Sequence, residues 1–303
     1  MHACMHARGY TVSEERIGKA LEGVREKIVI ATKSGCRTRD EILKELETSL
    51  RNLRTDYIDV YQLHGVSSKE TWDQVRAPEG VLEALCEARD QGKIRHLGIT
   101  SHDPKLMVDV VTEGIFETLL IPYNFLATLS GEDLLPLCRK LGVGTIIMKP
   151  FGGGAFTNIA TALKFLLADR NVNVVVPGMM TVQEVEENVA VAKGSHRLTA
   201  EDRRLVEKDR KELGGEYCRG CDYCQPCPQK IPISFVLRTE TQFLRRMGWS
   251  PHLEEQLHMA EELVPTCRKC GECESRCPYH LQIRELLPVK IVSLKRRIEM
   301  KDF

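Results

Sequence analysis

Alternating strand and helix signals predict an α/β fold, namely a TIM-type (β/α)8 barrel that lacks its first strand or strands, followed by a small α-helical domain. Between Val12 and about Lys193, short runs rich in Val and Ile alternate with amphipathic helical patterns, which is typical of parallel βα units. Six strands are clear, each followed by a helix, whereas a closed barrel needs eight. Beyond residue 197 the chain carries helical patterns without an alternating strand signal.

The predicted strands are short and rich in β-branched residues, as buried parallel strands are. They comprise residues 27–33, 57–64, 94–100, 118–124, 143–149 and 173–178. The residues before Tyr10 could supply most of one more strand. We therefore expect a barrel that is cut short at its N-terminal end.

Helix signals follow these strands, and capping residues mark some of their starts. Thr11 or Ser13 can cap a helix after Tyr10, and Asp103 followed by Pro104 opens another. The other barrel helices are expected from residue 38 and over residues 79–91, 132–141, 160–169 and 182–192. A charged helix over residues 198–213 is expected to link the domains, and the second domain is expected to hold helices over residues 234–247, 251–263 and 283–300.

Two cysteine runs in the last third of the chain define the second domain, and they hold eight of the twelve cysteines. The runs are Cys218, Cys221, Cys224 and Cys227 before Pro228, and Cys267, Cys270, Cys273 and Cys277 before Pro278. In the second run, the spacing is that with which three thiolates bind one 4Fe-4S cluster and the fourth binds another. We expect a barrel over residues 1–196, a linker helix over 197–214 and a helical ferredoxin-like iron-sulfur domain over 215–303.

Crossed ligation follows from this spacing. One cluster is expected on Cys218, Cys221, Cys224 and Cys277, and the other on Cys267, Cys270, Cys273 and Cys227. In the first run, two residues rather than three precede the last cysteine, so the crossed assignment is left more open for that run.

Other uses of the cysteines stay as alternatives. Zinc also takes four cysteines, but its sites usually pair two CxxC motifs across a longer loop. Disulfides need an oxidising compartment, and no signal peptide is evident. His2, Cys4 and His6 could form a metal trio. The remaining cysteines are expected to be small buried hydrophobes, namely Cys36, Cys86 and Cys138.

Composition places the chain among globular proteins. Its 303 residues are 42% hydrophobic and 28% charged, with a formal net charge of zero. A neutral chain offers no general attraction to nucleic acid or to an anionic membrane, and no apolar run approaches the ~18 residues of a membrane span. With no export signal and oxygen-sensitive clusters expected, the cytoplasm is the expected location.

Polar residues that end predicted strands are the candidates for catalysis, because catalytic side chains of α/β barrels lie at the C-terminal ends of the strands. They are Tyr10, Lys33 and His64. A phenol as proton donor, an ammonium that lowers the pKa of the phenol and an imidazole that orients a carbonyl oxygen form a proton-transfer set. Each residue alone is more often structural or solvated.

Glycines after the last two predicted strands suggest a phosphate site, which such barrels place there. The first of the two strands ends in KPFGGG, where Gly152, Gly153 and Gly154 allow close backbone approach. The second ends in PGMMT, where free N–H groups before the helix at Val182 could hold a diphosphate. The alternative is that the glycines only make turns. No GxGxxG follows a first strand, which disfavours a Rossmann domain.

Several stretches together resemble the aldo/keto reductase barrel in order and spacing: ARGYTVSEERIGKAL, IATK, YIDVYQLH, LGITSH, IIMKPFGGG and PGMMTVQEVEEN. The tail CRGCDYCQPCP with CRKCGECESRCPYHL is similar to that of the subgroup with a ferredoxin-like iron-sulfur domain. The resemblance covers nearly the whole chain. It implies nicotinamide-dependent carbonyl reduction with Tyr10 as general acid, Lys33 lowering the pKa of Tyr10 and His64 positioning the carbonyl.

The resemblance also implies contacts with the nucleotide. Thr100, Ser101 and Asn124 would face the nicotinamide amide. The residues along the rest of the dinucleotide would be Gly152, Gly178, Thr181, Glu187 and Asn188. No Lys or Arg lies in PGMMTVQEVEEN to pair a 2′-phosphate, which favours NAD over NADP without excluding NADP.

Two departures from the family pattern lie near the N-terminus. The catalytic aspartate of the family precedes the tyrosine by five residues in a DTAxxYG-like pattern, and Met5 takes that position here. The family's first strand is also absent. A displaced start codon, a gene fragment and a degenerate enzyme are the open explanations.

The leading hypothesis is an oxidoreductase that uses NADP or NAD on a small carbonyl substrate and carries two 4Fe-4S clusters. Hydride transfer moves two electrons whereas a cluster passes one, and no flavin signature is evident. The clusters would therefore serve a separate redox protein partner or be structural. Alternatives are a one-electron relay or interaction protein with an inactive barrel, and an incomplete gene product. The basic residues Lys295, Arg296 and Arg297 are expected to be a solvated helix end, although they could dock an acidic partner.

Overall fold

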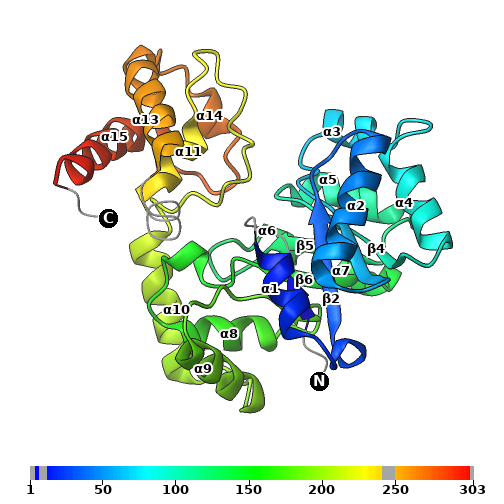
Figure 1. Cartoon of the computed structure of the whole chain (residues 1–303). Coiled ribbons are helices and arrows are strands. Elements are labelled where there is room, and N and C mark those ends of the chain that lie inside the picture. Colours follow the sequence, from blue (N-terminus) through cyan, green and yellow to red (C-terminus); the bar gives the residue numbers. More distant parts are fainter. Residues whose placement is uncertain (1–3, 7–11, 241–249, 301–303) are drawn as a thin grey trace. The chain divides into compact units, whose positions relative to one another are not determined.

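The computed structural model describes residues 4–6, 12–240 and 250–300 (Figure 1). The chain forms two compact units. The first comprises residues 1–123, 128–148 and 169–178, and the second comprises residues 124–127, 149–168 and 179–303.

The first unit is built on a seven-stranded parallel sheet whose strands pair in chain order. The strands are β1 (Cys4–His6), β2 (Val29–Ser34), β3 (Ile58–Leu63), β4 (Ile94–Thr100), β5 (Thr118–Pro122), β6 (Gly144–Met148) and β7 (Val174–Val175). In the part of the chain that the structure describes, β1 and β7 are the edges of an open sheet. This confirms the prediction of an α/β barrel that lacks part of its strand set.

Helices connect the strands of this unit. They are α1 (Ser13–Ala20), α2 (Arg39–Leu53), α3 (Lys69–Val75), α4 (Val81–Asp90), α5 (Pro104–Thr112), α6 (Leu129–Glu132) and α7 (Leu134–Leu141). The short helices α3 and α6 were not expected. Ser68 caps α3 by accepting a hydrogen bond from the Thr71 N–H on its hydroxyl, and α3 buries Trp72 and Val75.

The core of the first unit is mainly apolar, and two carboxylates are buried in its described part, Glu14 of α1 and Asp59 of β3. All six positions of β3 are buried, because β3 lies inside the sheet. Glu14 of α1 accepts hydrogen bonds from Thr32 Oγ1 (2.7 Å), Ser49 Oγ (2.8 Å) and Asn52 Nδ2 (3.2 Å). These bonds compensate the burial of the charge and tie α1 to β2 and α2.

Helices make up most of the second unit. They are α8 (Ile159–Leu167), α9 (Val182–Lys193), α10 (Ala200–Leu213), α11 (Ile233–Arg238), α13 (Pro251–Leu263), α14 (Glu272–Ser275) and α15 (Ile283–Met300). Phe125 and Phe156 stack with their ring centroids 4.1 Å apart in one core of this unit. Asp202 of α10 accepts hydrogen bonds from Thr161 and Lys164 and so fastens α10 to α8.

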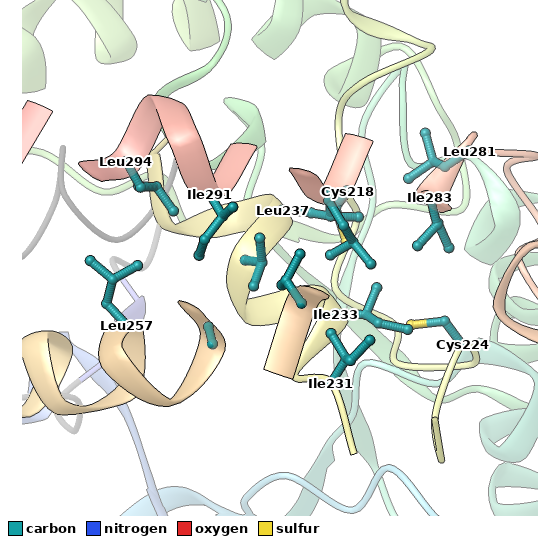
Figure 2. Close-up of a cluster of buried hydrophobic side chains, with 14 of the residues drawn as sticks. Cys218, Cys224, Ile231, Ile233, Leu237, Leu257, Leu281, Ile283, Ile291 and Leu294 are labelled. Carbon is teal, nitrogen blue, oxygen red and sulfur yellow. The ribbon is translucent and has the colours of Figure 1, made fainter. Parts of the chain in front are cut away.

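A second core surrounds the cysteine runs. Figure 2 shows Cys218 and Cys224 in the same buried cluster as Ile233, Leu257 and Leu294. Apolar side chains from α11, α13 and α15 therefore enclose part of the cysteine-rich segment. Among the described helices, none combines the length and the apolar character that crossing a membrane requires.

Candidate functional site

The carboxyl ends of β2, β3 and β4 meet at one edge of the sheet of the first unit. Lys33 in β2 pairs in register with Gln62 in β3, and Leu63 pairs with Ile99 in β4. The His64 N–H, just after β3, donates to the Ser34 carbonyl at 2.8 Å. The structure therefore brings Lys33 and His64 to neighbouring strand ends. Lys33 is half-buried and His64 is exposed.

Thr100 and Ser101 lie at the same edge, but their hydroxyls bond within the protein. Both residues are buried. Thr100 Oγ1 accepts from the Gly65 N–H at 2.9 Å, and Ser101 Oγ accepts from the Asp103 N–H at 2.9 Å. These bonds hold the loops after β3 and β4, so both residues shape this edge of the sheet.

The N-terminal part of the expected site is only partly described. Tyr10 and His2 lie outside the described residues. Met5, at the position of the family's aspartate, belongs to β1, where it pairs in register with Ile30. Lys33 and His64 are therefore the members of the expected catalytic set whose placement the structure gives.

Gln62 is a polar residue of this site that the sequence reasoning missed. Its side chain is fully buried at 0% exposure, and among the described residues neither Oε1 nor Nε2 has a hydrogen-bond partner. It lies two residues before His64, on the same face of β3, and beside Lys33. The signal that could have found it is an amide between the apolar residues Tyr61 and Leu63 near the end of the strand pattern YIDVYQLH.

Gly98 makes room beside Gln62. A Cβ at position 98 would lie 2.4 Å from Thr118 Oγ1 and 2.9 Å from Gln62 Cγ. Thr118 Oγ1 is likewise buried without a hydrogen-bond partner among the described residues. A small polar patch thus lies inside the sheet, next to the strand ends that carry Lys33 and His64.

Asn124 and Gly152, two of the expected nucleotide contacts, lie in loops of the second unit and stabilise them. Asn124 Oδ1 accepts from the Leu126 and Ala127 N–H groups, and its Nδ2 donates to the Lys149 carbonyl at 2.9 Å. Gly152 lies in a glycine turn over Gly152–Gly154, whose three residues all have positive φ, from 57° to 98°. Two of the turn's N–H groups, those of Gly152 and Gly154, bond to nearby carbonyls. The glycines therefore make a turn that residues with a side chain would strain.

The start of α9 differs from the free N–H cradle that the sequence suggested. Thr181 caps the helix, and the Glu184 carboxylate accepts hydrogen bonds from the Met180 and Thr181 N–H groups. This capping box places an anion of the protein at the positive end of the helix. Further along α9, Glu187 is exposed and Asn188 is buried, while Gly178 follows β7 in the first unit and is exposed.

Two pockets of the second unit are each lined by four cysteines. The inner pocket, of about 20 Å³, is lined by Cys218, Cys221, Cys224 and Cys277. The outer pocket, of about 160 Å³, is lined by Cys227, Cys267, Cys270 and Cys273. The pockets group the cysteines in the same two sets as the expected crossed ligation. Iron binding by these sets stays a prediction.

The thiols of each set surround a space. Among the described residues, no three His, Cys, Asp or Glu side chains converge closely enough to hold a single metal ion. One zinc ion draws its thiolates to about 2.3 Å from one point, whereas a cluster of several metal ions and sulfides fills a volume between its ligands. Four thiols line each pocket, which is the donor set that an iron-sulfur cluster takes.

Burial and charge differ between the pockets. Three of the four thiols of the inner pocket are buried, and burial raises the pKa of the Cys218 thiol to about 11. Binding of iron would therefore displace a proton from Cys218. In the outer pocket Cys270 is exposed and the other three cysteines are half-buried.

Two arginines lie beside the inner pocket. Arg219 lines it, with its guanidinium 4.3 Å from the ring centroid of Tyr279. A Cβ on Gly220 would lie 2.5 Å from Arg238 Nη1. The missing side chain at position 220 therefore lets Arg238 lie over the backbone between Cys218 and Cys221.

The comparisons with known proteins agree with this arrangement of strands and cysteines. Residues 6–161 match the aldo/keto reductase family, and residues 217–282 match a 4Fe-4S dicluster domain. The chain therefore belongs to the aldo/keto reductase family of oxidoreductases and carries a C-terminal 4Fe-4S dicluster domain.

Individual relatives match between about half and two thirds of the chain. The uncharacterized oxidoreductase YqkF of Bacillus subtilis is 24% identical over 251 residues, which cover 66% of this chain and 79% of that protein. The NADH-specific methylglyoxal reductase of Escherichia coli is 28% identical over 178 residues, 51% of this chain and 54% of that protein. Among solved structures, the holo form of aldo-keto reductase AKR11C1 from Bacillus halodurans has a TM-score of 0.56 and 26% identity, covering 65% of this chain and 77% of that one.

Proposed function

We propose that the chain is a nicotinamide-dependent oxidoreductase that reduces a small carbonyl compound and holds two 4Fe-4S clusters in its C-terminal domain. The observation that carries the proposal is the placement of Lys33 and His64 at neighbouring strand ends of an aldo/keto reductase sheet. A bound reduced nicotinamide would supply hydride. Tyr10 would supply the proton, Lys33 would stabilise the phenolate of Tyr10, and His64 would orient the carbonyl oxygen.

The nucleotide would lie along the residues that the family resemblance indicates. These are Thr100, Ser101, Asn124, Gly152, Gly178, Thr181, Glu187 and Asn188. Residues 177–188 contain three glutamates and no Lys or Arg, so a 2′-phosphate would find no cation there. This favours NADH over NADPH, as does the name of the NADH-specific relative.

The clusters would bind in the two cysteine-lined pockets, with one residue of each set coming from the other run. Hydride transfer moves an electron pair whereas each cluster accepts one electron. The barrel and the clusters would therefore act on different partners, or the clusters would stabilise the domain.

The test uses the full chain prepared without oxygen. Iron and acid-labile sulfide are expected at about eight each per chain if two clusters are present. NADH oxidation is then followed with a series of aldehydes that includes methylglyoxal. We expect activity in the wild type, none in Tyr10→Phe, and an unchanged rate in the control Tyr57→Phe, whose phenol bonds Glu26. Zinc in place of iron, or activity that survives in Tyr10→Phe, would contradict the proposal.

A one-electron relay with an inactive barrel is the second candidate. Met5 at the position of the catalytic aspartate and the Glu184 carboxylate at the start of α9 favour it. A chain that binds no nucleotide yet reversibly reduces its clusters would support the relay. Met5→Asp separates the two candidates further, because it should raise turnover only in a barrel that binds NADH.

A further inference from the structure

We propose that the mouth of the outer pocket is the docking surface for an acidic one-electron carrier protein, with Arg268 and Lys269 as its recognition residues. The proposal rests on the proposed cluster in the outer pocket. It names the partner and the surface that the proposed function leaves open.

Exposure singles out the outer pocket. Cys270 is the exposed member of the two cysteine sets, whereas Cys218, Cys224 and Cys277 of the inner pocket are buried. The outer pocket is also larger, at about 160 Å³ against about 20 Å³. Electron transfer between proteins weakens steeply with distance, so a carrier reaches the chain most closely where a ligand thiol is exposed.

The basic side chains around the mouth of the outer pocket fall into two classes, those with an acidic partner and those without one. Arg276 and Arg284 have acidic partners, Glu272 at 3.4 Å and Glu274 at 2.6 Å. Arg268 and Lys269 directly precede Cys270, are exposed, and have no acidic partner among the described residues. Next in sequence to the exposed thiol, the chain therefore presents two positively charged side chains that no described acidic side chain pairs with, although the whole chain has a net charge of zero.

The paired arginines fix the backbone that presents these two charges. Arg284 Nη1 donates to the Lys269 carbonyl at 3.2 Å, and Arg276 donates to the carbonyls of Gln225 and Pro226 at 3.1 and 3.0 Å. Arg276 and Arg284 thus hold the loop in place, and Arg268 and Lys269 remain for a partner. A preformed positive patch attracts an acidic surface at long range and orients it on approach.

The proposed reaction is the transfer of a single electron, and it balances as follows. The reduced carrier loses one electron, and the iron-sulfur centre of the outer pocket gains it. No bond forms or breaks, and no proton is required. A 2Fe-2S ferredoxin of the plant type and a flavodoxin are suitable probes, because both are acidic one-electron carriers.

Binding is measured first, independently of turnover. The full chain with its clusters is titrated with a redox-inert, gallium-substituted plant-type ferredoxin in a calorimeter at low ionic strength. We expect the double variant Arg268→Gln/Lys269→Gln to bind about tenfold more weakly and with a flatter salt dependence. The matched control Lys295→Gln/Arg296→Gln removes the same charge from exposed positions of α15, roughly 16 Å along the helix from Arg284. It should change the dissociation constant by less than about twofold.

Electron transfer is measured second. The rate at which reduced flavodoxin reduces the clusters should fall by about tenfold in the same double variant and stay unchanged in the control. Equal effects of the two double variants, unchanged binding in Arg268→Gln/Lys269→Gln, or no binding of either carrier to the wild type would overturn the proposal. Iron analysis of the same samples separates the two hypotheses. Missing clusters would refute the proposed function, whereas intact clusters with unaffected binding would refute the docking surface alone.

Discussion

At the scale of single residues, the structure identifies a buried polar side chain that the strand pattern of the sequence did not single out. Gln62 occupies a fully buried position of β3, between Lys33 and Gly98 in register. A buried amide without hydrogen bonds costs about 1–3 kcal/mol of stability. Such a cost is typical of sites retained for function, and Gln62 lies beside the two described members of the proposed catalytic set.

Replacing Gln62 tests this cost. We expect Gln62→Leu to raise the free energy of unfolding by about 1 kcal/mol, because an apolar side chain of similar size needs no hydrogen bonds. Urea unfolding of the full chain gives the measurement. The control Gln74→Leu, at an exposed position of α3, should stay within about 0.5 kcal/mol of the wild type. A loss of stability in Gln62→Leu would mean that the amide is hydrogen-bonded in solution.

Arg238 provides a second residue-scale prediction. Its guanidinium lies over Gly220, beside the inner pocket, and a positive charge there favours the reduced form of a cluster. We expect Arg238→Gln to lower one of the two reduction potentials by an amount on the order of 30–60 mV, up to a tenfold change for one electron. Potentiometric titration followed by electron paramagnetic resonance resolves the two signals. Arg296→Gln should move neither, and equal shifts of both signals in Arg238→Gln would speak against a local effect.

At the scale of elements, the start of α9 decides how a dinucleotide could bind. Glu184 already satisfies the N–H groups of Met180 and Thr181. An incoming diphosphate would meet the negative charge of this carboxylate at the same helix end. The cap that stabilises the helix would thus compete with a dinucleotide, the ligand that the family resemblance implies.

Removing that charge should strengthen nucleotide binding. Glu184→Gln keeps a capping-box side chain but loses its charge, so we expect the dissociation constant for NADH to fall by about two- to fivefold. Fluorescence titration of NADH measures the change. Glu186→Gln removes an equal charge from the same helix and should have a smaller effect. Weaker binding in Glu184→Gln would show that the nucleotide does not use this helix end.

At the scale of the whole molecule, we expect bound metal to matter more for the second unit than for the first. The core of the second unit includes Cys218, Cys224 and Cys277 themselves, so a metal cluster on these thiols would contribute to its packing. The first unit has a core of apolar strands and helices, with Tyr61, Leu97 and Ile147 among its buried side chains.

Iron removal should therefore loosen one unit selectively. After chelation we expect backbone amides of residues 217–240 and 250–282 to exchange with deuterium at least about tenfold faster, because bound metal contributes directly to the stability of small metal-dependent domains. Amides of β2 to β5 should change little and serve as the internal control. Equal loosening of both units would contradict the prediction, as would unchanged exchange in residues 217–240 and 250–282.

The sequence by itself determined most of the helices and strands and the residue types that could bind metal. Strands such as Ile94–Thr100 and helices such as Pro251–Leu263 could be predicted because hydrophobic periodicity and caps are local properties. The cysteine spacing predicted an iron-sulfur domain, since a cluster binds closely spaced thiolates.

Only the tertiary structure decided the features that depend on residues far apart in the sequence. It placed Cys227 with the second cysteine run and Cys277 with the first around two pockets. It also buried Gln62 without a hydrogen-bond partner among the described residues, and it placed the Glu184 carboxylate at the start of α9. The strand over residues 173–178 also shortened to Val174–Val175, because the ladder with β6 holds only two of its residues. Burial, register and hydrogen-bond competition depend on neighbours in space, which a local pattern does not contain.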